Sequence, residues 1–287
     1  MTYREAVAHG EKVLELSHIA DAKTDAWLLL EMGCKIDRKF YYMHMEDDLS
    51  DDLLKEYELA IKKRAEHIPL QYIVGETEFM GLKFKVNSNV LIPRQDTETL
   101  VEEALKTVKP GMKVLDMCTG SGCIIISILH NVEGVKGYAV DISKQAVNVA
   151  KENAKLNEVP VLFERSDLFE MVTEKFDVIV SNPPYIASAE VEKLMPEVRD
   201  HEPRMALDGT EDGLHFYRRI IEEAGKHLVS SGMLFFEIGY DQGQAVSELM
   251  RTEGYHEVQV VQDYAGLDRV VFGTYVTVQP APFAKSR

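Results

Sequence analysis

The sequence predicts an α/β protein in which a Rossmann-like domain with a seven-strand, doubly wound sheet follows a small helical domain and a β-hairpin. Three observations indicate this: helical periodicity at the start of the chain, a short alternating segment after it, and repeated strand–helix alternation from about residue 95. At 287 residues the chain suits two domains. We expect a helical domain over 1–70, a linking hairpin over 71–92 and the α/β domain over 93–287.

Helices are expected up to about residue 68, because apolar side chains recur there at three- and four-residue spacing. The repeat is clear over 6–16, 27–30 and 53–61. Ser50 precedes the last of these stretches and can cap its helix at the N-terminus. The pattern predicts four or five short helices.

Over 71–92 the spacing of apolar side chains changes from the helical repeat to an alternating pattern. Phe84 and Val86 alternate with lysines there, and Gly75 and Gly81 punctuate the segment. Alternation of this kind, interrupted by glycines, is typical of a hairpin. We expect it to join the two domains.

Strands and helices alternate through the rest of the chain, which favours a sheet with helices on both faces. The strands are expected at 112–116, 135–141, 160–165, 176–181, 231–238, 256–262 and 269–275, and the helices at 96–108, 122–131, 143–156, 213–229 and 241–253. The last two strands follow one another without a helix, so they should form an antiparallel hairpin at the sheet edge. Residues 187–212 show no clear period, and we expect a lid or docking loop there.

The composition narrows the class of protein. A formal net charge of −16 and a pI of about 5.0 disfavour direct contact with nucleic acid. The cysteines, Cys34, Cys118 and Cys123, show neither a disulfide framework nor a metal-ligand spacing, so no metal is expected. No apolar signal region or membrane-length window is evident, and we expect a cytoplasmic monomer with no membrane partner.

A glycine-rich turn follows the first strand of the α/β domain in "VLDMCTGSGCIIIS", residues 114–127. Glycines let the backbone turn sharply and let a ligand approach closely, and ligands of such sheets bind beyond the carboxyl ends of the strands. The spacing differs from that of dinucleotide enzymes. A short glycine turn after an acidic residue suits S-adenosylmethionine, whose cationic groups favour a carboxylate; the alternative is a plain strand–helix turn. The candidate cofactor residues are Asp116, Cys118, Thr119, Gly120, Ser121 and Gly122.

Acidic residues end the next two predicted strands. Asp141, followed by Ile142, lies 19 positions after Gly122, near the roughly twenty-residue spacing of a ribose-binding carboxylate. Asp141 could instead, or also, cap the following helix. Asp167 could accept a hydrogen bond from an adenine amino group while Leu168 packs on the ring, although a turn aspartate is an equal alternative. The convergence of three strand ends favours a cofactor site.

The fourth strand ends in "SNPPY", which places Asn182, Pro183, Pro184 and Tyr185 at the same edge of the sheet. Asn182 offers an acceptor and a donor, the prolines remove two N–H donors and stiffen the turn, and Tyr185 offers a flat face. These groups suit a planar –NH2, and none of them is a general base. We therefore predict methylation of an amide or an aromatic amine, by orientation and electrostatics.

With these motifs the chain resembles the glutamine N5-methyltransferases that modify peptide-chain release factors, the PrmC/HemK family. The resemblance runs nearly end to end. It is carried by "QYIVGETEFMGLKFKVNSNVLIPRQDTETLVE" (71–102), "LDMCTGSG" (115–122), "VDIS" (140–143), "SNPPYI" (181–186), "EPRMALDGTEDGLHFYR" (202–218), "FEIGYDQG" (236–243) and "DYAGLDRVVFG" (263–273).

The resemblance implies a helical N-terminal domain that binds the substrate, S-adenosylmethionine as methyl donor, and the glutamine of the Gly-Gly-Gln motif of class 1 release factors as acceptor. By matching motif, Asn182 to Tyr185 hold the substrate amide, and Asn182 also lies near the methyl group. Cys118 replaces a glycine that is usual in the family, and Leu168 stands where many members carry tryptophan. The family commonly reads "PRPETE" where this chain has "PRQDTE" (93–98).

Three alternatives stay open. A glutamine methylase of ribosomal proteins shares the motifs, and an adenine N6-methyltransferase shares the "NPPY" turn, although the acidic charge disfavours nucleic acid. A non-catalytic module on the same scaffold is the third, and the presence of both the glycine turn and the "NPPY" turn argues against it.

Overall fold

The computed structural model describes residues 1–276, so the end of the predicted α/β domain, 277–287, lies outside the described residues. The chain divides into two compact units, which are described separately below. One unit consists of Met1–Glu76, Val86–Ser88 and Leu194–Glu202, and the other of Thr77–Lys85, Asn89–Lys193 and Pro203–Arg287.

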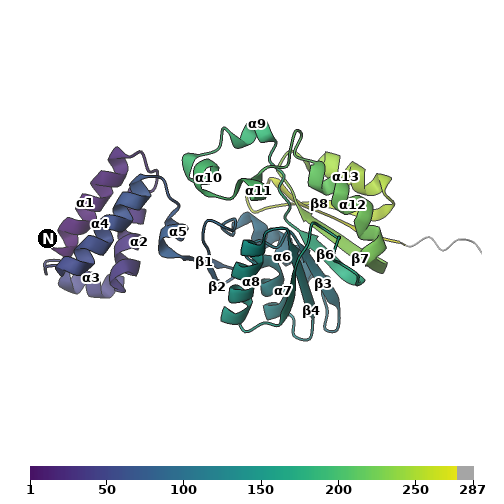
Figure 1. The fold of residues 1–287 in the computed structure, drawn as a ribbon, viewed down its shortest axis with the longest axis horizontal. Helices are drawn as coiled ribbons and strands as arrows, with labels where there is room; N and C mark the ends of the chain where they lie inside the picture. Colours follow the sequence, from purple (N-terminus) through teal and green to yellow (C-terminus); the bar gives the residue numbers. More distant parts are fainter. Residues whose placement is uncertain (277–287) are drawn as a thin grey trace, which may run out of the picture. The chain divides into compact units, whose positions relative to one another are not determined.

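The first unit is helical. Its helices in the N-terminal segment are α1 (Tyr3–Leu16), α2 (Ala22–Cys34), α3 (Arg38–His44), α4 (Asp51–Ala65) and α5 (Leu70–Val74) (Figure 1). Leu14, Leu30 and Tyr57 are fully or almost fully buried in its core, as their helical spacing predicts. The Ser50 side chain accepts a hydrogen bond from the backbone N–H of Leu53, which confirms the predicted cap of α4.

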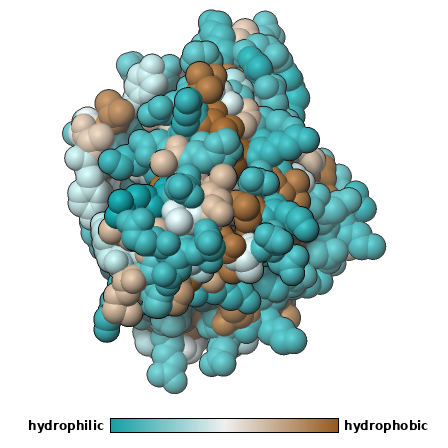
Figure 2. All heavy atoms as spheres, turned by 90° about the vertical axis from the view of Figure 1, so that its left-hand side faces the viewer, coloured by the Kyte–Doolittle hydropathy of each residue, from teal (hydrophilic) through white to brown (hydrophobic). Residues whose placement is uncertain are grey.

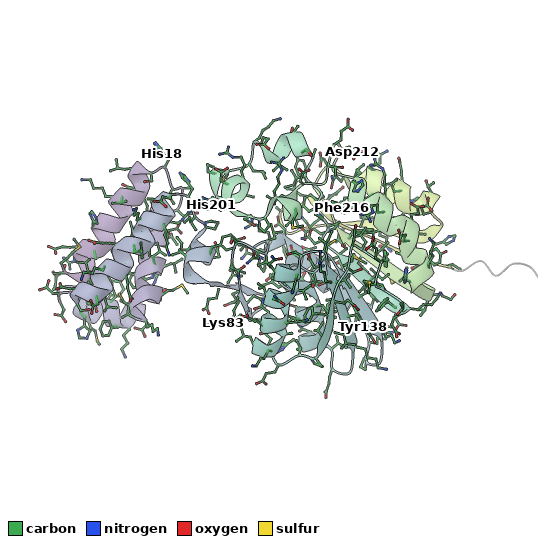
Figure 3. All side chains as sticks on the ribbon, viewed as in Figure 1. His18, Lys83, Tyr138, His201, Asp212 and Phe216 are labelled. Atoms are coloured by element: carbon green, nitrogen blue, oxygen red, sulfur yellow. The ribbon has the colours of Figure 1, made fainter. Side chains whose placement is uncertain are left out.

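A buried arginine ties a distant segment to these helices. Arg64 Nε donates to Asp25 Oδ2 at 2.6 Å, and Arg64 Nη2 donates to Glu197 Oε2 at 3.0 Å. Glu197 lies in α10 (Pro196–His201), where the His201 ring also contacts the Glu66 carbonyl at 3.2 Å (Figure 3). Because a buried guanidinium needs paired acceptors, these contacts explain why 194–202 packs with the helices.

The predicted hairpin is shorter than expected. Its strands are β1 (Glu76–Phe79) and β2 (Leu82–Lys85), joined by Met80 and Gly81, which both have positive φ as a two-residue type I′ turn requires. Phe79 and Phe84 are buried, with their ring centroids 6.0 Å apart. The start of the expected hairpin was wrong, since 71–74 lies in α5; Gly75, in the left-handed conformation, ends that helix.

The second unit contains a seven-stranded sheet in the order β5-β4-β3-β6-β7-β9-β8 (Figure 1). Its strands are β3 (Lys113–Met117), β4 (Lys136–Asp141), β5 (Val161–Arg165), β6 (Phe176–Ser181), β7 (Leu228–Glu237), β8 (Tyr255–Gln262) and β9 (Asp268–Tyr275). Strands β3 to β7 are parallel, and β9 runs antiparallel to both β7 and β8. The seven predicted strands and the closing antiparallel hairpin are confirmed, and β7 begins earlier than the expected 231.

Helices cover both faces of this sheet. One core cluster joins it to α6 (Asp96–Leu105), α7 (Cys123–Asn131) and α8 (Lys144–Leu156), and the other joins it to α12 (His215–His227) and α13 (Gly243–Thr252). The Rossmann-like, doubly wound fold is therefore confirmed.

The region 187–212, expected as a lid or docking loop, contains three short helices: α9 (Ser188–Val191), α10, and α11 (Arg204–Leu207). Every helix within residues 1–276 is too short or too polar to cross a bilayer. Most of the surface in the view of Figure 2 is hydrophilic, with narrower hydrophobic patches between.

Candidate functional site

The carboxyl ends of β3, β4, β5 and β6 meet at one edge of the sheet because these strands are parallel neighbours. A pocket of about 590 Å³ opens there, within the range typical of small-molecule sites. Its remaining walls come from the stretches 89–94 and 203–210 and from α12. All of these segments belong to the second unit.

The glycine turn forms the floor of the pocket beside β3. Gly122 has a φ of +81° and caps α7, and a Cβ there would lie 3.0 Å from Ile126 and 3.1 Å from Ala150. Only glycine therefore fits without strain. Cys118, which replaces the glycine usual in the family, also has a positive φ of 62°, and its side chain lines the pocket.

Asp116 is buried beneath this turn and is not among the lining residues. The Thr119 hydroxyl donates to Asp116 Oδ2 at 2.6 Å. Burial raises the pKa of the Asp116 carboxyl to about 7, although the bond from Thr119 opposes the shift. Asp116 thus holds Thr119, which lines the pocket, and is not itself a lining residue.

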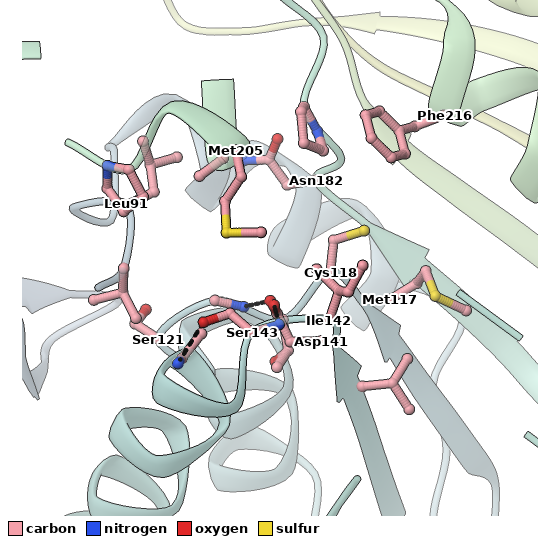
Figure 4. A pocket seen from close by; sticks show the side chains of 18 of the residues that line it. Leu91, Met117, Cys118, Ser121, Asp141, Ile142, Ser143, Asn182, Met205 and Phe216 are labelled. Carbon is pink, nitrogen blue, oxygen red and sulfur yellow. Dashed lines mark hydrogen bonds between the residues drawn. The ribbon is translucent and has the colours of Figure 1, made fainter. Parts of the chain in front are cut away.

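Asp141 connects the glycine turn to the end of β4. Its Oδ2 accepts from the Gly120 N–H at 2.9 Å and its Oδ1 accepts from the Ser143 N–H at 2.8 Å. Burial raises its pKa, and these two backbone bonds oppose the increase. Ser143, not Asp141, caps α8, because the Ser143 side chain accepts from the Ala146 N–H. Asp141 lines the pocket, across from Asn182 and Met205 (Figure 4).

The third strand end contributes Asp167 and Leu168, and both line the pocket. Arg219 Nη2, from α12, lies 3.1 Å from Asp167 Oδ1, so an ion pair forms one wall. Leu168 is buried and has a positive φ of 48°, which turns the chain sharply after β5. Ile142, at the end of β4, lines the pocket as well.

The Asn-Pro-Pro-Tyr turn follows β6. Asn182 and Pro184 line the pocket, whereas Pro183 and Tyr185 are not among its lining residues. Asn182 Nδ2 donates to Thr97 Oγ1 at 3.4 Å. The Tyr185 hydroxyl donates to Glu237 Oε1 at 3.2 Å, and burial raises the pKa of Tyr185. The aromatic ring that was expected to face a substrate is thus not among the residues that line the pocket.

Several lining residues were missed by the sequence analysis. Thr97, Met205, His215, Phe216 and Arg219 all line the pocket, and Phe216 is marked on α12 in Figures 3 and 4. The segment 202–218 had supported the resemblance without any predicted role in the site. The absence of a clear period over 187–212 gave no indication that residues 203–210 line the pocket at the strand ends.

The sheet order and this pocket together place the protein among the Rossmann-like methyltransferases. The family model "PrmC N-terminal domain" matches residues 5–75, and "Methyltransferase small domain" matches residues 94–198. A methyltransferase structure from Pyrococcus furiosus shares the fold, with a TM-score of 0.53 and 18% identity over 69% of this chain and 90% of that one.

Relatives of higher sequence identity indicate which methyltransferase family the chain belongs to. The release factor glutamine methyltransferase of Clostridium acetobutylicum is 41% identical over 94% of this chain and 98% of its own length. That of Geobacter sulfurreducens is 40% identical over 95% and 96%, and that of Thermodesulfovibrio yellowstonii is 42% identical over 83% and 87%. The chain belongs to the family of release factor glutamine methyltransferases.

Proposed function

We propose that this protein transfers a methyl group from S-adenosylmethionine to the side-chain amide nitrogen (N5) of the glutamine in the Gly-Gly-Gln motif of class 1 peptide-chain release factors. The observation that carries the proposal is that Asn182 lies in the same pocket as the glycine turn and Asp141. A polar group suited to an amide therefore faces a cleft suited to a nucleoside. Family membership supports the same reaction in the cytoplasm, where translation ends.

The pocket fits S-adenosylmethionine in size and in chemistry. Each Asp141 oxygen accepts one backbone N–H, and each keeps lone-pair capacity for a ribose hydroxyl. Ile142 and Leu168 supply apolar surface for the adenine, and Asp167 supplies an acceptor for its amino group. The turn from Cys118 to Gly122 brings backbone close to the ligand. Bound there, the cofactor supplies an electrophilic methyl group and leaves as S-adenosylhomocysteine.

The residues after β6 hold the acceptor nitrogen in place. Asn182 Oδ1 accepts one hydrogen of the glutamine –NH2, while the rigid prolines keep the turn in position. An amide nitrogen is a poor nucleophile because its lone pair is delocalised. Hydrogen bonds that favour a pyramidal nitrogen aim that lone pair at the methyl carbon, and the proton leaves once the nitrogen has become acidic. Catalysis then depends on orientation and electrostatics.

We further propose that the helical domain over 1–70 binds the release factor away from the reacting tip. A single glutamine offers little surface, so additional contacts are needed for affinity. Deleting residues 1–70 should reduce methylation of a whole release factor much more than methylation of a short Gly-Gly-Gln peptide. The peptide reaction serves as the control for folding, and equal losses on both substrates would refute the role.

Labelled S-adenosylmethionine and a purified class 1 release factor test the main proposal directly. We expect label on the release factor, located at the Gly-Gly-Gln glutamine by mass spectrometry. Label on a ribosomal protein instead would favour the ribosomal-protein methylase, and label on adenine in DNA or RNA would favour the nucleic-acid enzyme. Either result, without label on the release factor, would refute the proposal.

A further inference from the structure

Gln242 contacts the Asn-Pro-Pro-Tyr turn from a motif, "FEIGYDQG" (236–243), that supported the resemblance without any predicted role. Its Nε2 donates to the Tyr185 carbonyl at 2.9 Å, and its Oε1 accepts from the Gly239 backbone N–H at 2.9 Å. A backbone N–H can only donate and a carbonyl can only accept, so these two partners fix which end of the amide faces the turn. Gln242 therefore joins the turn after β7 to the turn after β6.

The chain that leads from α11 to α12 contacts the same end of the turn through its backbone. The Ile186 N–H donates to the Leu207 carbonyl at 3.0 Å, and the Gly209 N–H donates to the Ile186 carbonyl at 2.8 Å. Gly213 lies so close that a Cβ there would be 2.3 Å from the Tyr185 carbonyl oxygen, so no side chain fits. The Tyr185 carbonyl thus has a single available place, and Gln242 donates to it there.

The other end of the turn is held by the sheet. Ser181 ends β6, and its hydroxyl donates to the Met117 carbonyl of β3 at 2.7 Å. The two prolines between these ends have a fixed φ, so few torsions are left to absorb a movement. A displacement of the Tyr185 carbonyl would therefore be passed on to Asn182, which lines the pocket.

We propose that Gln242 is a positioning residue, which locks the Tyr185 end of the Asn-Pro-Pro-Tyr turn and thereby holds Asn182 where it receives the amide of the acceptor glutamine. The inference rests on the proposed function of Asn182. Gln242 is not among the lining residues, so it acts through the turn and not by contact with cofactor or substrate. The "FEIGYDQG" motif thus helps to orient the acceptor nitrogen, on which catalysis depends.

Gln242→Glu tests the proposal, because it keeps the shape of the side chain and replaces the donor –NH2 with an oxygen. At about pH 8 we expect kcat on a Gly-Gly-Gln peptide to fall about 10- to 100-fold, with the Kd for S-adenosylhomocysteine nearly unchanged. Gln244→Glu is the matched control, since it adds the same charge two positions further on, where the side chain is exposed and contacts Glu248. Its kcat should equal that of wild type.

The pH dependence of Gln242→Glu separates positioning from a general loss of packing. A protonated carboxyl donates one hydrogen bond, as the amide does, whereas an ionised carboxylate only accepts. The carbonyls of Tyr185 and Gly213, at 2.9 and 3.4 Å from Gln242 Nε2, face that position and favour the protonated form. The turnover of the variant relative to wild type should therefore rise as the pH is lowered from about 8 to about 6.

The charged and titratable groups near this position are also present in wild type, so their own titration largely cancels in the ratio. They are the hydroxyls of Tyr185 and Tyr217, the carboxyls of Glu237, Asp241 and Asp268, and the guanidinium of Arg269. Gln242→Met has a side chain of similar length that neither donates nor titrates. Its turnover relative to wild type should be low at every pH.

The outcomes separate this inference from the proposed function. If wild type methylates the release factor and Gln242→Glu turns over as fast as Gln244→Glu at about pH 8, the positioning role is refuted alone. A loss of turnover that comes with an equal loss of affinity for S-adenosylhomocysteine, or that does not change with pH, would also refute it, because it would indicate a general effect on packing. Absence of methylation by wild type would refute the proposed function, and the positioning role with it.

Discussion

Asp141 Oδ2 accepts a hydrogen bond from the Gly120 backbone N–H at 2.9 Å, which joins the turn after β3 to the end of β4. The second oxygen accepts from Ser143 at 2.8 Å, so this one carboxylate orders the start of α8 as well. The same carboxylate lines the pocket. We therefore expect the loss of this carboxylate to weaken the binding of the cofactor.

Asp141→Ala should weaken the binding of S-adenosylhomocysteine about 10- to 100-fold, because a charged acceptor and the order of the turn are lost together. Isothermal calorimetry gives the Kd directly. Glu102→Ala is the control, since it removes an equal charge whose side chain contacts Tyr264 and does not line the pocket. A Kd for Asp141→Ala equal to that of the control would leave Asp141 a purely structural role.

Asn182→Ala should lower kcat about 100- to 1,000-fold while the Kd for the cofactor changes little, because the lost group faces the acceptor amide. Single-turnover methylation of a Gly-Gly-Gln peptide measures the effect. Asn131→Ala serves as the control, because it removes an amide that donates to the Ser127 carbonyl of α7 and does not line the pocket. Undiminished turnover in Asn182→Ala would show that the amide does not hold the substrate.

Gly122→Ala should destabilise the second unit by about 2–4 kcal/mol, from the left-handed backbone together with the close approach to Ile126 and Ala150. Gly120→Ala is the comparison: its φ of +55° also disfavours alanine, but a Cβ there meets nothing within 4 Å. Its cost should be only about 1–2 kcal/mol. Urea unfolding measures both, and a reversed order would contradict the packing argument.

The raised pKa of Asp116 predicts that the stability of the protein depends on pH. Its folded pKa of about 7 lies above the ordinary value of 3.8, so between these values the folded state keeps a proton that the unfolded state has released. Its contribution to the free energy of unfolding therefore falls as pH rises, by up to about 1.4 kcal/mol per pH unit.

Asp116→Asn removes this titration and keeps an acceptor for Thr119. The stability of the variant relative to wild type should increase as the pH rises from 5 to 7. Urea unfolding at several pH values within this range gives the difference. If the difference in stability between the variant and wild type did not change from pH 5 to 7, Asp116 would be ionised over this whole range.

Local patterns account for most of the architecture. Strand β6 begins and ends at the predicted residues. Its end was predictable because two prolines, which cannot continue a ladder, follow the apolar run and Asn182. The same patterns located Asp141 and Asp167 at strand ends. The start of the hairpin was misjudged, since Tyr72 to Val74 suit a strand as well as the single helical turn that they form.

What the sequence by itself determined is the order of elements and the residues that end each strand, because both follow from side-chain period and from proline and glycine. Only the tertiary structure decided which atoms of those residues face the pocket. Asp116 and Tyr185 were predicted to face a ligand, yet burial turns one toward Thr119 and the other toward Glu237. Thr97 meets Asn182 across 85 positions of the chain. Such contacts depend on how helices and strands that are distant in the sequence pack together. The local spacing of apolar side chains does not predict them.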